Sequence, residues 1–131
     1  MSANGSDLRT PLGRVAGLGA ARSGTGHFWW QRLTAVANVP LTIAFVVILV
    51  SLFGRNQAFA QQTLGTPVVA LIMLLFIVSI TYHMRLGMQV VIEDYVHGEF
   101  ARPLLIMLNT FFTVTVGLAA AYGVLKLSFG V

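Results

Sequence analysis

The stretch LTAVANVPLTIAFVVILVSLFG, residues 33–54, contains no charged residue. A helix needs about 20 apolar residues to cross the hydrocarbon core of a bilayer, so this run is long enough to span a membrane. Asn38 and Pro40 interrupt it near its start, where we expect either a kink, a contact with a neighbouring helix, or a proline that the helix simply tolerates. The stretch predicts a first transmembrane helix.

Two further apolar runs follow. One covers about residues 67–92 and opens with Pro67, a residue that suits the first position of a helix. The other covers about residues 103–125 and ends before Lys126. Polar residues connect the runs at 55–62 and 93–102. The sequence therefore predicts an all-α membrane protein of three transmembrane helices (about 33–54, 67–92 and 103–125) that form one membrane domain, residues 27–131.

The composition supports a membrane protein. Hydrophobic residues make up 56% of the chain and charged residues only 9%, whereas a soluble domain has about a quarter of its residues charged. The net charge of +4 does not indicate nucleic acid, because the basic residues are scattered singly at the ends of the apolar runs. The chain has no cysteine, which excludes disulfides and thiolate ligands for a cluster or zinc.

Residues 1–26 hold little apolar material, so we expect a flexible cytoplasmic tail there. We do not expect a secretory signal peptide there, because the first long apolar run begins only after it and is long enough to stay in the bilayer; an Arg-rich start with one acid leaves a transit peptide as a minor alternative. The side of the tail and of the second connector carries most of the flanking cations, Arg9, Arg14, Arg22, Arg32 and Arg102; the other side has Arg55 and Lys126. The positive-inside rule then predicts that the N-terminus lies in the cytoplasm or its organellar equivalent. We expect a multi-pass protein of the bacterial inner membrane. The mitochondrial inner membrane is the less favoured alternative.

His83 is the histidine that lies within a predicted span, about 9–14 Å inside the cytoplasmic end of the second span at ~1.5 Å per residue. Ionisable residues at such depth are costly and usually face protein. At 100° per residue, Arg85 points almost opposite to one stripe of the helix, which is formed by Ser79, His83, Gly87, Val90 and Asp94.

Two interpretations of this stripe stay open. Gly87 leaves room for a flat group, so His83 could be an axial ligand of haem iron. Alternatively, His83 forms a hydrogen bond to a neighbouring helix and Gly87 serves only close packing. A second haem ligand would need another polypeptide, since His97 stands roughly 21 Å away along a continuous helix and His27 precedes the first span.

Asp94 and Tyr95 follow at the cytoplasmic mouth of the second span. A phenol beside a carboxylate could form a hydrogen bond to a quinone carbonyl and help to deliver protons. An interfacial tyrosine next to a helix-end acid is also common in membrane proteins and is favoured by position alone.

The string HMRLGMQVVIEDYVH, residues 83–97, resembles the H-x-x-x-G-M-x-x-V-x-x-D-Y signature of the succinate dehydrogenase hydrophobic membrane anchor family, whose members are also called the cytochrome b556 small subunit. The matching residues are His83, Gly87, Met88, Val91, Asp94 and Tyr95. WQRLTA, residues 30–35, is similar to the arginine-bearing start of the family's first span. The resemblance covers about residues 27–127.

This resemblance implies one subunit of a heteromeric helix bundle in respiratory complex II. His83 is then an axial ligand of haem b, shared with the second, cytochrome b anchor of the complex, and Arg32 contacts a haem propionate. Tyr95 and Asp94 help to bind ubiquinone near the iron–sulfur subunit, which receives electrons from the flavoprotein subunit. The chain would serve electron transport between the tricarboxylic acid cycle and the respiratory chain without being an enzyme alone.

Three alternatives remain on the sequence. A quinol–fumarate reductase anchor has similar architecture, and the direction of catalysis is not written in these residues. A purely structural anchor would use His83 and Tyr95 for packing. A small oligomeric transporter would be expected to place an acid deep in a span, and none lies there.

Overall fold

The computed structural model describes residues 22–131, with side chains from residue 25 onward. This part contains three long helices, α2 (Arg22–Leu52), α4 (Pro67–Tyr95) and α5 (Ala101–Phe129), and one short helix, α3 (Gln57–Gly65). No strand occurs within it. Each long helix is long and apolar enough to cross a membrane. The prediction of an all-α protein with three transmembrane helices is therefore confirmed.

The helices extend beyond the apolar runs that predict them. A helix of 29 residues, such as α4 or α5, is ~43 Å long, whereas the hydrocarbon core is ~30 Å thick. The helix ends therefore reach the headgroup region, where polar residues are solvated. The first helix also begins early, since residues 22–26 of the expected N-terminal tail are already helical. The remainder of that tail, residues 1–21, lies outside the described residues.

The first polar connector contains a helix where the sequence predicts only a link. Asn56 caps α3, since its side chain accepts a hydrogen bond from the Phe59 backbone N–H at 2.9 Å. The Arg55 guanidinium lies 5.1 Å from the centre of the Phe59 ring. Leu64 is buried, and α3 packs against α4 and α5. The connector is thus a short helix folded against the bundle.

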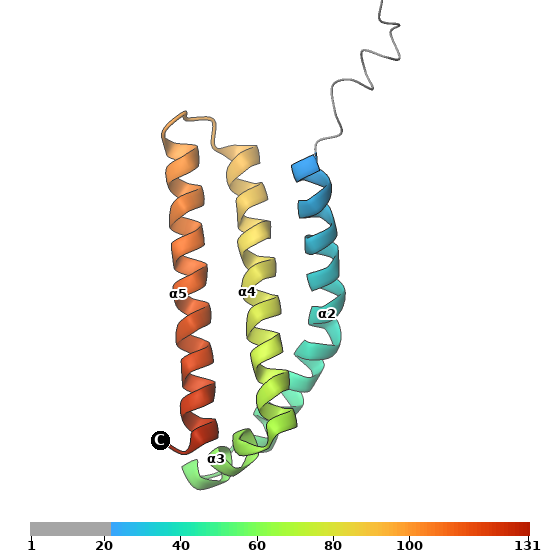
Figure 1. The fold of residues 1–131 in the computed structure, drawn as a ribbon, viewed down its shortest axis with the longest axis vertical. Coiled ribbons are helices and arrows are strands. Elements are labelled where there is room, and N and C mark those ends of the chain that lie inside the picture. Colours follow the sequence, from blue (N-terminus) through green and yellow to red (C-terminus); the bar gives the residue numbers. More distant parts are fainter. Residues whose placement is uncertain (1–21) are drawn as a thin grey trace, which may run out of the picture.

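The three long helices form an open layer with α4 in the middle (Figure 1), and α4 packs against both α2 and α5. Phe45 of α2 stacks on Phe76 of α4 with ring centres 4.7 Å apart. On the other side, Gly117 of α5 faces the Thr81 side chain of α4, and a Cβ added there would lie 3.4 Å from it, in ordinary van der Waals contact. Many large apolar side chains on the outer faces are exposed, as lipid or further helices require.

Helix α2 bends part way along its length, and its second half passes toward α3 (Figure 1). Pro40 lies inside this helix. Proline has no N–H to donate and its ring crowds the carbonyl one turn earlier, so it accounts for the bend. One of the outcomes expected at Asn38 and Pro40, a kink, is therefore present.

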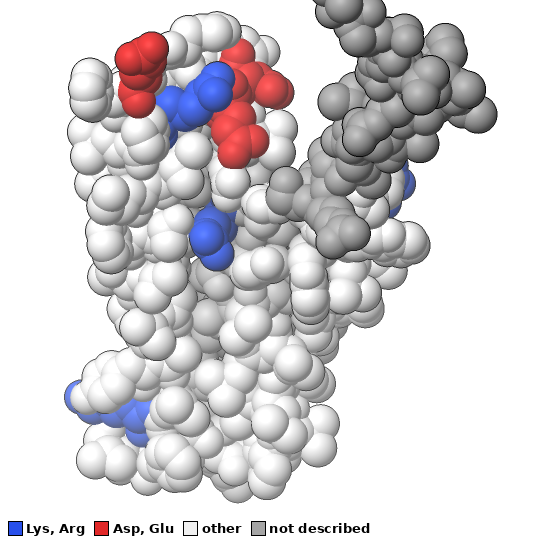
Figure 2. All heavy atoms as spheres, turned by 45° about the horizontal axis from the view of Figure 1, so that its top comes forward, with Lys and Arg blue, Asp and Glu red and all other residues white. Residues whose placement is uncertain are grey.

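The described chain has two distinct ends. The start of α2 and the α4–α5 connection lie together at one end, which we call the loop end, defined by residues 25–32 and 93–102 (Figure 1). Helix α3 and the C-terminus lie at the opposite end, the α3 end (Figure 1). Acidic side chains of the described residues gather at the loop end (Figure 2), where they are Glu93, Asp94 and Glu99.

Candidate functional site

The imidazole of His83 lies between α4 and α2. Its Nδ1 is 3.0 Å from the Oγ1 of Thr34, a residue of α2 that is only 7% exposed. His83 itself is half-buried. The ring is therefore turned toward protein, as an ionisable group in a membrane requires.

The hydrogen bonds of Thr34 indicate which partner donates in its contact with His83. The Thr34 hydroxyl donates to the backbone carbonyl of Trp30 at 2.8 Å, and the carbonyl of Gln31 is 3.1 Å away. A hydroxyl has one proton to donate, so this arrangement favours Thr34 Oγ1 as the acceptor of the His83 Nδ1–H. In the tautomer that carries its proton on Nδ1, the lone pair of Nε2 is available for a ligand or a further hydrogen bond.

His83 stands roughly 18 Å from the end of α4 at Tyr95. Because α4 exceeds the ~30 Å hydrocarbon core by roughly 7 Å at each end, a helix centred in the bilayer places the imidazole roughly 11 Å inside the hydrocarbon boundary, within the expected 9–14 Å.

Two neighbours of His83 have the orientation expected from helix periodicity. Arg85 points away from α2, since its Nε donates to Thr110 Oγ1 of α5 at 3.3 Å. Gly87 faces α2, where the Gln31 Nε2 lies 3.6 Å from the position of an added Cβ. A Cβ at this distance would make ordinary van der Waals contact, so Gly87 lies at the contact between α2 and α4 without being required for it.

A cavity of about 780 Å³ opens between α2 and α4 at the loop end. Both helices line it with polar and apolar side chains, namely His27, Phe28, Gln31, Arg32, Ala35, Leu86, Gln89, Val90 and Glu93. Of the predicted site residues, Arg32 belongs to this lining, with its guanidinium 4.6 Å from the centre of the Phe28 ring. His83, Asp94 and Tyr95 do not line the cavity.

Two polar side chains in this cavity were not expected to be functional. Gln31 Oε1 is buried and has no hydrogen-bond partner among the described residues. Glu93 Oε1 accepts a hydrogen bond from Gln89 Nε2 at 2.8 Å. The sequence singles out Asp94, yet the carboxylate that faces the cavity is that of Glu93. The spacing of Gln31, Thr34 and Asn38, which places three polar residues on one face of α2, is a signal that could have identified this face.

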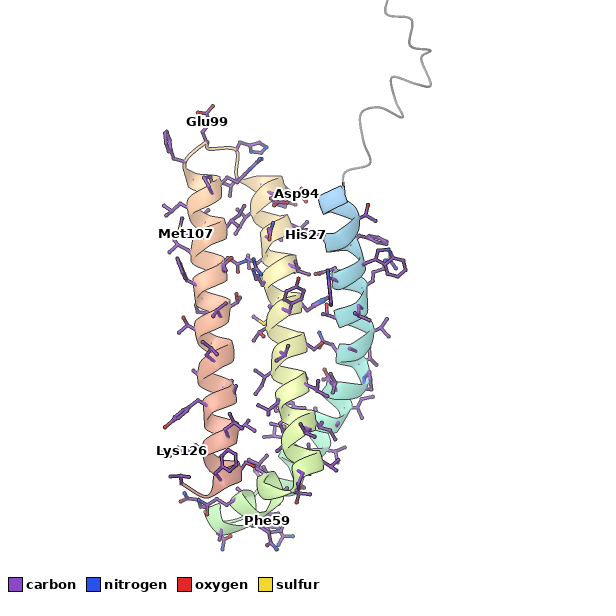
Figure 3. The ribbon with its side chains drawn as sticks, viewed as in Figure 1. His27, Phe59, Asp94, Glu99, Met107 and Lys126 are labelled. Carbon is purple, nitrogen blue, oxygen red and sulfur yellow. The ribbon has the colours of Figure 1, made fainter. Side chains whose placement is uncertain are left out.

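Tyr95 and Asp94 lie at the last turn of α4, and Tyr95 is 79% exposed. Figure 3 shows Asp94 at the same end of the molecule as His27 and Glu99, far from Lys126 and Phe59. Arg102 holds this turn in place, since its guanidinium donates to the carbonyls of Val96 and Glu93, both at 3.1 Å. A cation on these last carbonyls stabilises a helix C-terminus.

The contact of Thr34 with His83 makes a prediction about stability. Thr34→Val keeps the side-chain shape but removes the acceptor of the imidazole N–H, so we expect a loss of about 1 kcal/mol in the free energy of unfolding. Denaturant titration of the purified protein in detergent micelles measures this value. Thr42→Val is the matched control, because Thr42 is exposed on the same helix. Equal stability of the two variants would contradict the proposed bond.

Comparison of the sequence with known proteins places the chain in a family. The family model described as succinate dehydrogenase/fumarate reductase transmembrane subunit matches residues 6–117 of this chain. A succinate dehydrogenase hydrophobic membrane anchor subunit of Paracoccus denitrificans is 32% identical over 121 residues, which cover 92% of this chain and 93% of that protein. The subunit of the same name from Rickettsia bellii is 29% identical over 108 residues, which cover 82% of this chain and 86% of the relative.

A third relative, the succinate dehydrogenase membrane anchor subunit of Reclinomonas americana, is 37% identical over 90 residues, which cover 62% of this chain and 70% of the relative. No solved structure matches the chain. The match of the family model over most of the chain, together with relatives of about its own length, shows that the chain belongs to the succinate dehydrogenase/fumarate reductase transmembrane subunit family.

Proposed function

We propose that this chain helps to bind haem b and ubiquinone in a succinate dehydrogenase, so that electrons from succinate reduce ubiquinone. Its role as a membrane anchor subunit, working in a complex with other subunits, follows from its family. The observation that supports the finer proposal is the contact between His83 and Thr34, because it turns the imidazole toward protein inside a span and leaves Nε2 without a partner among the described residues.

On this proposal His83 and Arg32 would hold haem b. When bound, haem b supplies a one-electron redox centre. His83 Nε2 would be one ligand of the iron, and a hydrogen bond from Nδ1–H to Thr34 would orient the ring for it. The second ligand would be a histidine of the companion anchor, since His97 lies beyond the end of α4 and His27 near the start of α2. Arg32, which lines the cavity at the loop end, would donate to a propionate.

Tyr95 fits a quinone site that is completed by another chain. Its phenol is largely exposed at the loop end, so a partner such as the iron–sulfur subunit can cover it. Reduction of ubiquinone takes up two electrons and two protons. The Tyr95 hydroxyl would donate a hydrogen bond to one carbonyl, and Asp94 beside it can pass protons from water. Arg102 holds this turn through its hydrogen bonds to the carbonyls of Val96 and Glu93.

Three spans and bacterial relatives support a multi-pass protein of the bacterial inner membrane. We infer that the loop end and the N-terminus face the cytoplasm, because positive flanking residues favour that side. The iron–sulfur and flavoprotein subunits would then dock at the loop end, close to Tyr95.

Two alternatives have an observation in their favour. The family includes fumarate reductase subunits, so the complex could run in the reverse direction with quinol as donor. A haem-free structural anchor is supported by Gln31, whose side chain occupies the space beside Gly87. The reverse enzyme differs from the proposal in the reaction that runs faster. The haem-free anchor differs from it in what the purified complex contains.

Purification in a mild detergent tests the complex. We expect a flavoprotein, an iron–sulfur protein and a second membrane chain to co-purify, and the preparation to reduce ubiquinone with succinate. A higher rate of fumarate reduction by quinol than of succinate oxidation would favour the reverse enzyme. Recovery of the intact chain without flavoprotein would reject both enzymes.

His83→Leu tests haem ligation. In the purified complex, we expect this variant to lose or shift the reduced-minus-oxidised haem b spectrum, because leucine supplies no axial ligand. His97→Leu is the control, since His97 is exposed beyond the end of α4 and should leave the spectrum unchanged. A wild-type spectrum in His83→Leu would exclude ligation by this residue, and a wild-type complex without any haem b spectrum would support the haem-free anchor.

Tyr95→Phe tests the quinone site. Removing a hydroxyl that donates to the quinone should lower ubiquinone reduction by succinate about tenfold, while electron transfer from succinate to a soluble dye stays normal. Tyr122→Phe is the control, because Tyr122 is similarly exposed but lies toward the α3 end. Unchanged rate and quinone affinity in Tyr95→Phe would show that the bond is not used.

A further inference from the structure

Arg85 is a cation held inside the hydrocarbon layer. Helix α4 exceeds the ~30 Å core by roughly 7 Å at each end, and Arg85 stands roughly 15 Å from Tyr95, so it lies roughly 8 Å below the boundary. Its side chain does not turn back toward the surface, because Nε donates to Thr110 Oγ1 at 3.3 Å. Thr110 lies roughly 13 Å from the start of α5, which gives the same depth independently.

The surroundings of Arg85 leave its charge unpaired within the described chain. The guanidinium has five N–H groups, and only Nε–H has a partner among residues 25–131. Arg85 faces a groove of about 260 Å³ between α4 and α5, whose other lining residues are neutral and include Thr81, Tyr82 and Thr113. In addition, Asn109 Nδ2 donates to the backbone carbonyl of Arg85 at 3.0 Å. The backbone carbonyl of Arg85 therefore has a hydrogen-bond partner, whereas the charge of its guanidinium has no counter-ion among the described residues.

An isolated charge in a low-dielectric environment is strongly unfavourable unless an opposite charge pairs with it. The spans α2, α4 and α5 contain only two acids, Glu93 and Asp94, both in the last turns of α4. The described residues of a second copy of this chain therefore offer no carboxylate at the depth of Arg85. A lipid phosphate lies outside the hydrocarbon boundary and is too shallow for a guanidinium fixed at Thr110.

We propose that Arg85 forms an intramembrane ion pair with an Asp or Glu of a transmembrane helix from another subunit, which docks along the α4–α5 groove. Arginine suits this role, since its planar fork can bind both oxygens of a carboxylate. The inference requires only that the complex contains a second membrane chain. It does not depend on haem or quinone binding, because Arg85 points away from His83.

The test uses the complete complex in mild detergent, after wild type has been shown to retain the second membrane chain. We expect Arg85→Gln to reduce the fraction of that chain retained through a heating step at least about tenfold, because it leaves a buried carboxylate unpaired. Arg85→Lys should retain most of it, since the charge is kept. Arg55→Gln is the control, because Arg55 is exposed at the α3 end and should behave as wild type.

A charge-reversal screen identifies the partner even if the variants fail to accumulate. Arg85→Glu should abolish assembly, and changing each transmembrane Asp or Glu of the second membrane chain to Lys, one at a time, should restore it at one position. Wild-type retention in Arg85→Gln, or no rescue at any position, would overturn the inference. If Arg85→Gln lost the haem spectrum but fully retained the second membrane chain, the inference would also be overturned, because the cation would then serve the haem. None of these outcomes bears on the co-purification that tests the proposed function.

Discussion

Polar side chains in the hydrocarbon core must find partners within protein, and this constraint connects the three spans of the chain. His83 and Arg85 lie two positions apart on α4, about 200° around the helix, so their side chains leave on nearly opposite sides. His83 meets Thr34 of α2, and Arg85 meets Thr110 of α5. The same short segment therefore binds α4 to both neighbours and accounts for its place in the middle of the layer.

Much of this arrangement could be predicted from the sequence. The uncharged runs indicated the three spans, and helix periodicity placed His83 and Arg85 on opposite faces. The helix ends could not be predicted as well, because interfacial residues such as those at 27–32 are polar or aromatic and still helical. The contact of His83 with Thr34 was also out of reach, since periodicity within one helix does not fix the register between two helices.

The loop end illustrates a different limit. Asp94 and Glu93 are adjacent in sequence, so a motif directs attention to Asp94, but successive residues of a helix point about 100° apart. Of these two acids, only Glu93 lines the cavity, together with residues such as Gln89 and Arg32. Asp94 and Tyr95 remain on the outer surface. The described part of this chain leaves Tyr95 uncovered, which is why the proposed quinone site needs a second polypeptide.

The depth of the ionisable groups has a consequence for proton transfer under the proposed function. From Pro67 to Ile80, α4 carries no ionisable side chain, and the described residues of α2 beyond Arg32 carry none either. In α5, the ionisable groups beyond Arg102 are Tyr122 and Lys126, close to the α3 end. The described spans thus offer no series of ionisable side chains across the half of the bilayer next to α3. Under the proposed function, protons for a quinone at Tyr95 would enter from the loop end, where the soluble subunits would dock, so its reduction would move no proton across the membrane through these spans.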